Sequence, residues 1–391
     1  MERLTGTVQH YPWGSTTAIP ALLGVPEDGQ PWAELWLGAH TSAPARVGDH
    51  DLDARVADSP GIVGDAAVER FGPRLPYLMK VLAAAEPLSL QAHPTRAQAE
   101  AGFAREEAAG IPVTAPHRNY SDDWPKPEAL CALDEMEALY GFADPMVVAD
   151  RFAALGVPEI DVLVAPLRDP GGPDGLREVF LGLCALPEER RGIITTVVTA
   201  AAALLERSDL DPGLTTFCRT AVELASRRPD DPGVVAALLM NRIRLSPGET
   251  IYLAAGNLHA YLRGTGVEIM ANSDNVLRGG LTGKHVDVAE LGRVLDFSPV
   301  EPQFVPVVED APGVLRFDTP APEFRMWRID ATERPVELPA TPYGRILLVT
   351  GGRVTVDDTT LARGESGWLT AGEGASAAGR GTMFLAAPGL D

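Results

Sequence analysis

Alternating hydrophobic and polar positions dominate two parts of the chain, and a helical periodicity lies between them. Residues 1–145 hold short alternating or apolar runs, among them 75–85 and 88–93, which are bounded by turn residues and predict β-strands. A single short helix is expected in this part, over 97–110, with a glycine at its end. Strand-like patterns resume after Leu245 and continue to the last residue.

Residues 146–244 have apolar positions at helical spacing instead. The pairs Asp211-Pro212 and Asp231-Pro232 are typical helix starts, because aspartate caps the first turn and proline fits the first helical position. The pattern predicts helices over 146–155, 176–186, 188–207, 214–228 and 234–243.

The chain is therefore predicted to be mainly β with an α insertion. We divide it into a β domain (1–145 and 245–300), a helical domain (146–244) and a C-terminal β domain (301–391). The C-terminal part has many short strands separated by Gly and Pro turns, which is typical of a sandwich or jelly roll.

The composition narrows the possible partners. The 391 residues carry a formal net charge of -21, which argues against nucleic acid and against an anionic membrane, because both repel an acidic surface. No run approaches the ~20 apolar residues of a membrane-spanning helix, and the first residues lack the apolar core of a signal peptide. The three cysteines are far apart and form no CxxC pair, which fits a protein of the reducing cytoplasm.

Two polar strand faces carry candidate metal ligands. In an extended strand, side chains two positions apart share a face, so Ser89, Gln91 and His93 would line one side of the strand predicted over 88–93. By the same rule His259 would point away from the apolar side chains that flank it. Each stretch alone would also fit a strand that faces solvent.

A third stretch, Trp124-Pro125-Lys126-Pro127-Glu128, adds a carboxylate. Each proline disfavours helical geometry in the residue before it, so the segment is held extended and its lysine and glutamate point the same way. Two histidines, a carboxylate and a glutamine oxygen suit zinc, and iron or manganese would fit these donor types nearly as well. The remaining histidines are assigned to loops or to the surface: His10, His40, His50, His117 and His285. Since none follows these, the C-terminal β domain cannot hold a histidine-ligated metal.

The run from Glu268 to Lys284 is dense in polar groups, including Asp274 and Arg278. Its glycines let a loop approach a ligand closely, and its two cations suit an anion. The run is not a Walker A motif and the chain has no GxGxxG, so nucleotide binding is poorly supported. A solvated hairpin is the alternative for this run taken alone.

Taken together, these stretches resemble the type I phosphomannose isomerases, metal-dependent enzymes of the cupin superfamily. The resemblance is carried, in order, by Tyr11-Pro12-Trp13-Gly14-Ser15, Ala33-Glu34-Leu35-Trp36-Leu37-Gly38, Gln91-Ala92-His93-Pro94, Lys126-Pro127-Glu128, Gly256-Asn257-Leu258-His259-Ala260-Tyr261 and the run from Glu268 to Lys284. Gly283 is a departure, because the family commonly has proline there. The resemblance implies two cupin-type jelly rolls plus a helical domain.

The resemblance also implies interconversion of mannose 6-phosphate and fructose 6-phosphate through an enediol(ate). It assigns Gln91, His93, Glu128 and His259 to one zinc ion per chain and Arg278 to the active site. The proton-transferring group stays open among Asp274, Glu268, Lys284 and Lys126. Contacts with the phosphate or the sugar hydroxyls are expected from Ser89, Lys126 and Lys284, and Trp13 and Glu34 are expected to line the pocket.

Three alternatives remain at this stage: an isomerase of another sugar phosphate, an iron-dependent cupin oxygenase, and a non-catalytic sugar-binding cupin. In the favoured interpretation the partner is a small sugar phosphate. The protein is then expected to be a cytoplasmic monomer of mannose metabolism, on the route to GDP-mannose.

Overall fold

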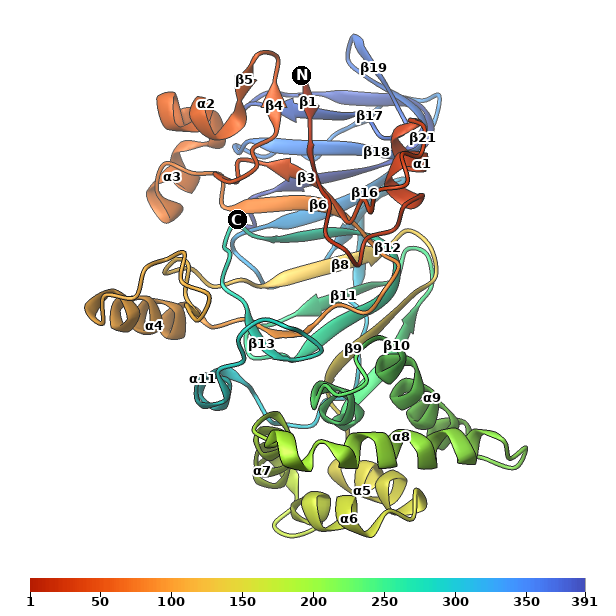
Figure 1. Ribbon diagram of the computed structural model, residues 1–391. Helices are drawn as coiled ribbons and strands as arrows, with labels where there is room; N and C mark the ends of the chain where they lie inside the picture. The colour runs from red at the N-terminus through yellow and green to blue at the C-terminus, as the bar shows by residue number, and fades with distance from the viewer. Residues whose placement is uncertain (391) are drawn as a thin grey trace.

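A ten-stranded antiparallel sheet lies between an eleven-stranded sheet at one end of the molecule and a group of helices at the other, as the computed structural model of residues 1–390 shows (Figure 1). The ten-stranded sheet consists of β2 (Thr7–Gln9), β3 (Glu34–Gly38), β6 (Tyr77–Ala84), β7 (Leu90–Ala92), β8 (Glu128–Ala132), β9 (Met136–Phe142), β10 (Met240–Leu245), β11 (Thr250–Leu253), β12 (His259–Ala271) and β13 (Leu277–Gly280). Its longest strand, β12, pairs with β6, β7, β8 and β9, so it connects the stretches that carry polar candidates.

The eleven-stranded sheet combines the C-terminal strands with three short strands from the start of the chain. Its members are β1 (Glu2–Thr5), β4 (Arg46–Val47), β5 (His50–Asp51), β14 (Val307–Ala311), β15 (Val314–Phe317), β16 (Arg325–Ala331), β17 (Val336–Glu337), β18 (Arg345–Val356), β19 (Thr359–Ala362), β20 (Ser366–Leu369) and β21 (Ser376–Ala387). Strand β1 pairs antiparallel with β20, with Glu2 opposite Trp368. The proposed boundary at residue 300 stays a prediction, but backbone pairing and one hydrophobic core that holds both Leu4 and Phe384 extend across it.

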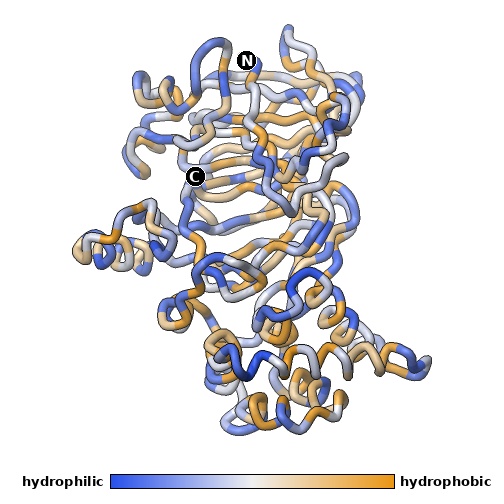
Figure 2. The backbone as a smooth tube through the Cα atoms, viewed as in Figure 1, coloured by the Kyte–Doolittle hydropathy of each residue, from blue (hydrophilic) through white to orange (hydrophobic). Residues whose placement is uncertain are grey.

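The helices fall into two groups. Those around the sheets are α1 (Ala18–Leu23), α2 (Leu52–Asp58), α3 (Asp65–Phe71), α4 (Arg96–Ala108) and α11 (Val288–Val294). Those of the helical end are α5 (Pro145–Ala154), α6 (Pro158–Val164), α7 (Gly172–Cys184), α8 (Gly192–Leu205), α9 (Pro212–Arg227) and α10 (Gly233–Ala236). Hydrophobic residues occur along the strands and along these helices (Figure 2). One apolar core in the helical end includes Phe152, Phe180 and Phe217. Across residues 1–390, each helix falls short of the length and hydrophobicity that a membrane span requires.

The predicted helical insertion is confirmed, with one error near its end. The helix predicted over 234–243 is wrong in its second half, because only Gly233–Ala236 is α-helical and β10 begins at Met240. The apolar run Val234 to Leu239 is helical, but residues from Met240 onward pair with β9, and this long-range pairing ends the helix. The short helices α1, α2, α3, α6 and α11 were not predicted.

The two sheets are held together in part by Tyr77 of β6. Its buried hydroxyl donates to the carbonyl oxygens of Gly344 (3.2 Å) and Ala386 (3.0 Å), both in the C-terminal part. Replacing Tyr77 by phenylalanine should lower the free energy of unfolding by about 1–2 kcal/mol, because two buried carbonyls lose a donor. Urea unfolding measures the loss; Tyr343→Phe is the control, since the Tyr343 hydroxyl has no hydrogen-bond partner in residues 1–390. Equal stabilities for the two variants would contradict this role.

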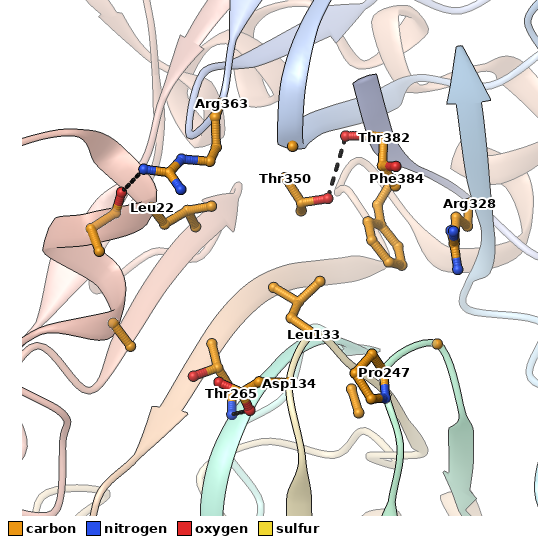
Figure 3. A pocket seen from close by; sticks show the side chains of 15 residues that line it. Leu22, Leu133, Asp134, Pro247, Thr265, Arg328, Thr350, Arg363, Thr382 and Phe384 are labelled. Atoms are coloured by element: carbon orange, nitrogen blue, oxygen red, sulfur yellow. Dashed lines mark hydrogen bonds between the residues drawn. The ribbon is translucent and has the colours of Figure 1, made fainter. Parts of the chain in front are cut away.

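A groove of about 420 Å³ separates the two sheets on one side (Figure 3). Leu133, Asp134 and Thr265 line it from the ten-stranded sheet, and Thr350, Thr382 and Phe384 face them from β18 and β21. Its arginines are engaged within the protein, Arg328 by Asp330 (3.0 Å) and Arg363 by the carbonyl of Ala21. None of the site residues predicted from the sequence lines this groove.

Candidate active site

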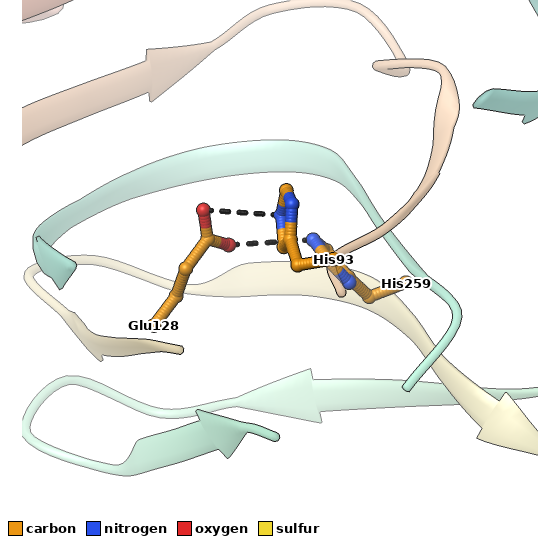
Figure 4. A group of neighbouring side chains, drawn as sticks. All are labelled: His93, Glu128 and His259. Atoms are coloured by element: carbon orange, nitrogen blue, oxygen red, sulfur yellow. Dashed lines mark ion pairs between the residues drawn. The ribbon is translucent and has the colours of Figure 1, made fainter. Parts of the chain in front are cut away.

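His93, Glu128 and His259 meet where three strands of the ten-stranded sheet come together. His93 directly follows β7, Glu128 opens β8 and His259 opens β12. Nε2 of His93 lies 3.2 Å from one Glu128 carboxylate oxygen, and Nε2 of His259 lies 3.3 Å from the other (Figure 4). All three side chains are buried, and their potential ligand atoms lie within 4.8 Å of one another. Three distant parts of the sequence therefore provide one cluster of metal-ligand type.

Backbone carbonyls set the tautomer of both histidines. Nδ1 of His93 lies 2.7 Å from the carbonyl oxygen of Asn275, and Nδ1 of His259 lies 3.1 Å from that of Asn257. A carbonyl oxygen only accepts, so each ring donates from Nδ1 and leaves the Nε2 lone pair directed at the cluster. The buried Nε2 of His93 has no hydrogen-bond partner in residues 1–390, which is the state of a nitrogen prepared for a metal.

Electrostatics favours the same donor set. Burial lowers the pKa of His93 to about 4, so its ring is neutral near pH 7. Burial alone would raise the pKa of Glu128, but His93 and Lys126, whose Nζ lies 3.2 Å away, outweigh it and hold that pKa well below the ordinary range. Imidazole nitrogens and an ionised carboxylate are ligands that zinc accepts.

Gln91 lies beside this cluster on β7. It is directly opposite His259 of β12 on one side and Arg278 of β13 on the other. Its side chain also lines the adjacent cavity. The sheet thus places Gln91 next to a ligand residue, and its own role as a ligand stays a prediction.

A cavity of about 600 Å³ adjoins the cluster. Its lining contains many of the residues singled out in the sequence: Trp13, Glu34, Ser89, Gln91, Lys126, Asp274, Arg278 and Lys284. Leu224, Arg227 and Arg228 of the helical end form another part of the wall. The structure therefore brings most of the predicted site residues to one cavity, and Glu268 lies buried beside it in contact with Lys80.

Lys80 is a site residue that sequence reasoning missed. It projects from β6 and its Nζ lies 3.5 Å from Glu34, 3.6 Å from Glu268 and 5.0 Å from the centre of the Trp36 ring. Burial opposes its charge, but Glu34 and Glu268 outweigh burial and raise the pKa of Lys80. A signal was present, because a lysine in the middle of an otherwise apolar strand is rarely buried without a partner.

Glu268 is the group in this network that titrates near neutrality. Burial, reinforced by the charge of Glu128, raises its pKa to about 7 although Lys80 works in the opposite direction. The hydroxyl of Tyr261 donates to Glu268 at 2.9 Å. Glu268 can therefore hold or release a proton near pH 7, which a general acid or base must do.

Arg278 and Lys284 form a cationic side of the cavity. The charge of Arg278, followed by burial, lowers the pKa of Lys284, and burial lowers the pKa of Arg278. Within residues 1–390 neither cation has a carboxylate partner. Two neighbouring unpaired cations repel each other, and an anionic ligand relieves that repulsion.

The Asp274 carboxylate pairs with His40, a contact that the sequence did not predict. Nε2 of His40 lies 3.2 Å from Asp274, and this hydrogen bond lowers the pKa of the Asp274 carboxyl. His40 lies in the loop after β3, as predicted, but it is buried and lines the cavity rather than the surface. It follows a buried strand, β3, and packs edge-on against Trp36, with 4.7 Å between ring centres.

Comparison with known proteins agrees with this geometry. The sequence model of the family "Phosphomannose isomerase type I, catalytic domain" matches residues 1–144. The chain is 38% identical to the mannose-6-phosphate isomerase of Salmonella typhimurium over 309 residues, covering 76% of this chain and 75% of that protein. It is 34% identical to the mannose-6-phosphate isomerase of Escherichia coli over 386 residues, covering 95% of both. The chain belongs to the type I phosphomannose isomerase family.

Solved structures of mannose 6-phosphate isomerases have the same fold. A mannose 6-phosphate isomerase bound with zinc and yttrium matches with a TM-score of 0.90 at 32% identity, covering 100% of both chains. A zinc-bound mannose 6-phosphate isomerase matches with a TM-score of 0.89, covering 100% of this chain and 99% of that one. These matches confirm the predicted mainly β architecture with a helical insertion as that of the phosphomannose isomerase family.

Proposed function

We propose that this chain is a zinc-dependent aldose–ketose isomerase that interconverts mannose 6-phosphate and fructose 6-phosphate. The observation that carries the proposal is the buried His93–Glu128–His259 cluster beside a cavity with two unpaired cations. The names of the relatives supply the substrate and the zinc-bound neighbours supply the metal. His93, Glu128 and His259, with Gln91 as fourth ligand, would hold one zinc ion per chain.

Aldose–ketose isomerisation moves a proton between C1 and C2 through an enediol(ate). Zinc, when bound, supplies Lewis acidity for the oxygens on these carbons. Arg278 contributes fixed positive charge toward the developing enediolate. Ser89, Lys126 and Lys284 bind the phosphate or the sugar hydroxyls, while Trp13 and Glu34 shape the wall of the cavity.

Among the candidate groups for proton transfer, Glu268 has the best-matched acidity. Its pKa of about 7 meets the requirement for a group that both takes and returns a proton. His40 lowers the pKa of Asp274 and so keeps it ionised, and among the remaining candidates the charge of Arg278 lowers the pKa of Lys284. We therefore propose Glu268 as the proton-transferring group, with Lys80 holding it in place.

The cellular setting is also a proposal. We place the enzyme in the cytoplasm as a monomer of mannose metabolism on the route to GDP-mannose, with both β regions of cupin type. The free thiols of Cys131, Cys184 and Cys218 are consistent with a reducing compartment.

A coupled assay on purified protein tests the proposed function. We expect conversion of mannose 6-phosphate to fructose 6-phosphate, loss of turnover on chelation and recovery when zinc is returned, because the side chains of the cluster do not supply the Lewis acidity of the metal. Metal analysis of the untreated protein should give one zinc per chain. Saturable sugar phosphate binding without product would indicate a binding protein, and oxygen uptake with bound iron would indicate an oxygenase. Faster conversion of another sugar phosphate would reassign the substrate.

A further inference from the structure

The loop that carries Lys284 is attached to the helical end of the molecule by Asp231. One carboxylate oxygen of Asp231 accepts from the backbone N–H of Gly233 (2.7 Å), and the other accepts from the backbone N–H of Thr282 (2.8 Å). The first contact lies within the helical segment and the second lies in the loop after β13. The Asp231-Pro232 pair, which the sequence presents only as a helix start, thus connects two parts of the chain 51 residues apart.

The connection continues from Thr282 to Lys284. The hydroxyl oxygen of Thr282 accepts from the backbone N–H of Lys284 at 3.1 Å. Between them, a Cβ added to Gly283 would meet nothing within 4 Å, so no neighbouring side chain packs this point of the loop. The position of Lys284 therefore depends on Thr282, and that of Thr282 depends on Asp231.

Close backbone packing supports the same joint. A Cβ on Gly233 would lie 2.4 Å from the backbone nitrogen of Leu281, so only glycine allows this approach. Leu281 itself has φ 55°, a left-handed conformation that costs about 1 kcal/mol or more for such a residue. The thiol of Cys184 on α7 also donates to the carbonyl oxygen of Gly279 at 3.2 Å. The helical segment holds this loop in a shape that it would not adopt alone.

We propose that Asp231 is a positioning residue, which fixes Thr282 and through it holds the Lys284 ammonium where the phosphate of the substrate binds. This inference rests on the proposed function, since it takes the substrate to be a sugar phosphate. By this proposal, the helical insertion sets the affinity of the cavity for the phosphate group. Arg278 does not depend on this link, since its strand pairs directly with β7.

The test compares Asp231→Asn with Asp144→Asn. Asparagine has the same shape but one acceptor oxygen instead of two. Its NH2 group therefore faces the backbone N–H of either Thr282 or Gly233, and that hydrogen bond is lost. Asp144 is the matched control, because it also accepts from two backbone N–H groups at a helix start, those of Met146 and Val147, and is remote in sequence from the loop. For Asp231→Asn we expect KM for mannose 6-phosphate to rise about five- to tenfold, the size of one loosened charge-assisted contact, with kcat changed less than about twofold. Asp144→Asn should leave both constants unchanged.

Two further measurements separate a positioning role from a general loss of structure. If Asp231 acts through Lys284, adding Asp231→Asn to Lys284→Ala should not raise KM further, because coupled residues are not additive. The Kd for mannitol 1-phosphate, a reduced sugar phosphate that cannot isomerise, should rise by the same factor as KM, with zinc content unchanged.

The inference is overturned by an unchanged KM, by effects of Asp231 and Lys284 that multiply, or by a loss of kcat at constant KM. Failure of this inference can be distinguished from failure of the proposed function. If the wild-type protein does not isomerise mannose 6-phosphate, the function is wrong, while the Kd for mannitol 1-phosphate still decides whether Asp231 controls phosphate affinity.

Discussion

Replacing Glu128 by glutamine should weaken zinc binding at least about a hundredfold, since removal of groups that merely orient a ligand already costs about 10–100-fold. Glu128 contacts both imidazoles and supplies the negative charge of the cluster. Its loss leaves Lys126 and the two imidazoles facing a divalent cation, without a negative charge in the cluster to balance it. Turnover at limiting zinc should fall at least as much and recover partly when zinc is added in excess. Metal analysis after gel filtration, together with a zinc titration of activity, measures both effects.

Glu106→Gln is the matched control for removal of a buried carboxylate. Glu106 is also buried, and it accepts from the backbone N–H groups of Asn119 and Tyr120 and pairs with Arg118 at 2.9 Å. This variant should lose thermal stability and keep its zinc. A Glu128→Gln protein that retains full zinc content would exclude Glu128 as a ligand.

Replacing Arg278 by alanine should lower kcat by about a hundredfold or more while zinc content stays at one per chain. Arg278 lies on β13 opposite Gln91 and lines the cavity next to the cluster, and no carboxylate among residues 1–390 pairs with it. Fixed charge of this kind stabilises an enediolate more than the neutral sugar, so the loss appears in turnover rather than in KM.

Two variants sharpen this experiment. Arg278→Lys keeps the charge but loses the planar set of donors, and it should recover only part of the activity. Arg244→Ala removes an exposed arginine that pairs with Glu135 on the surface, and it should leave kcat unchanged. An Arg278→Ala enzyme with wild-type kcat would remove Arg278 from the mechanism.

The members of the ligand cluster could be predicted from the sequence, because each lies in a short extended stretch whose neighbouring residues form a recognisable pattern. His93 follows Gln91 two positions later on one strand face, and Glu128 is held extended by prolines. These local patterns do not predict that the ligand side chains lie close together. Their proximity follows from the register that sets Gln91 opposite His259, which only the long-range pairing of β7 with β12 defines.

The network around Lys80 shows where sequence reasoning stops. Lys80 and His40 acquire their roles from side chains elsewhere in the chain, Glu34, Glu268 and Asp274. A buried charge is paired by tertiary packing, so neither its burial nor its partner is encoded within a short window. The helix predicted at the end of the insertion was too long for a related reason. Residues 240–245 pair with β9, and this long-range pairing cannot be predicted from the local periodicity.

The pairing of β1 with β20 has a consequence for synthesis on the ribosome. Glu2 lies opposite Trp368, so the first strand emerges from the exit tunnel long before its partner is translated. At about 5–20 residues per second, this strand and the neighbouring β4–β5 ribbon wait tens of seconds with open edges. A nascent chain that stalls before residue 366 should therefore expose an unpaired edge and recruit chaperones, whereas release of the full chain closes it.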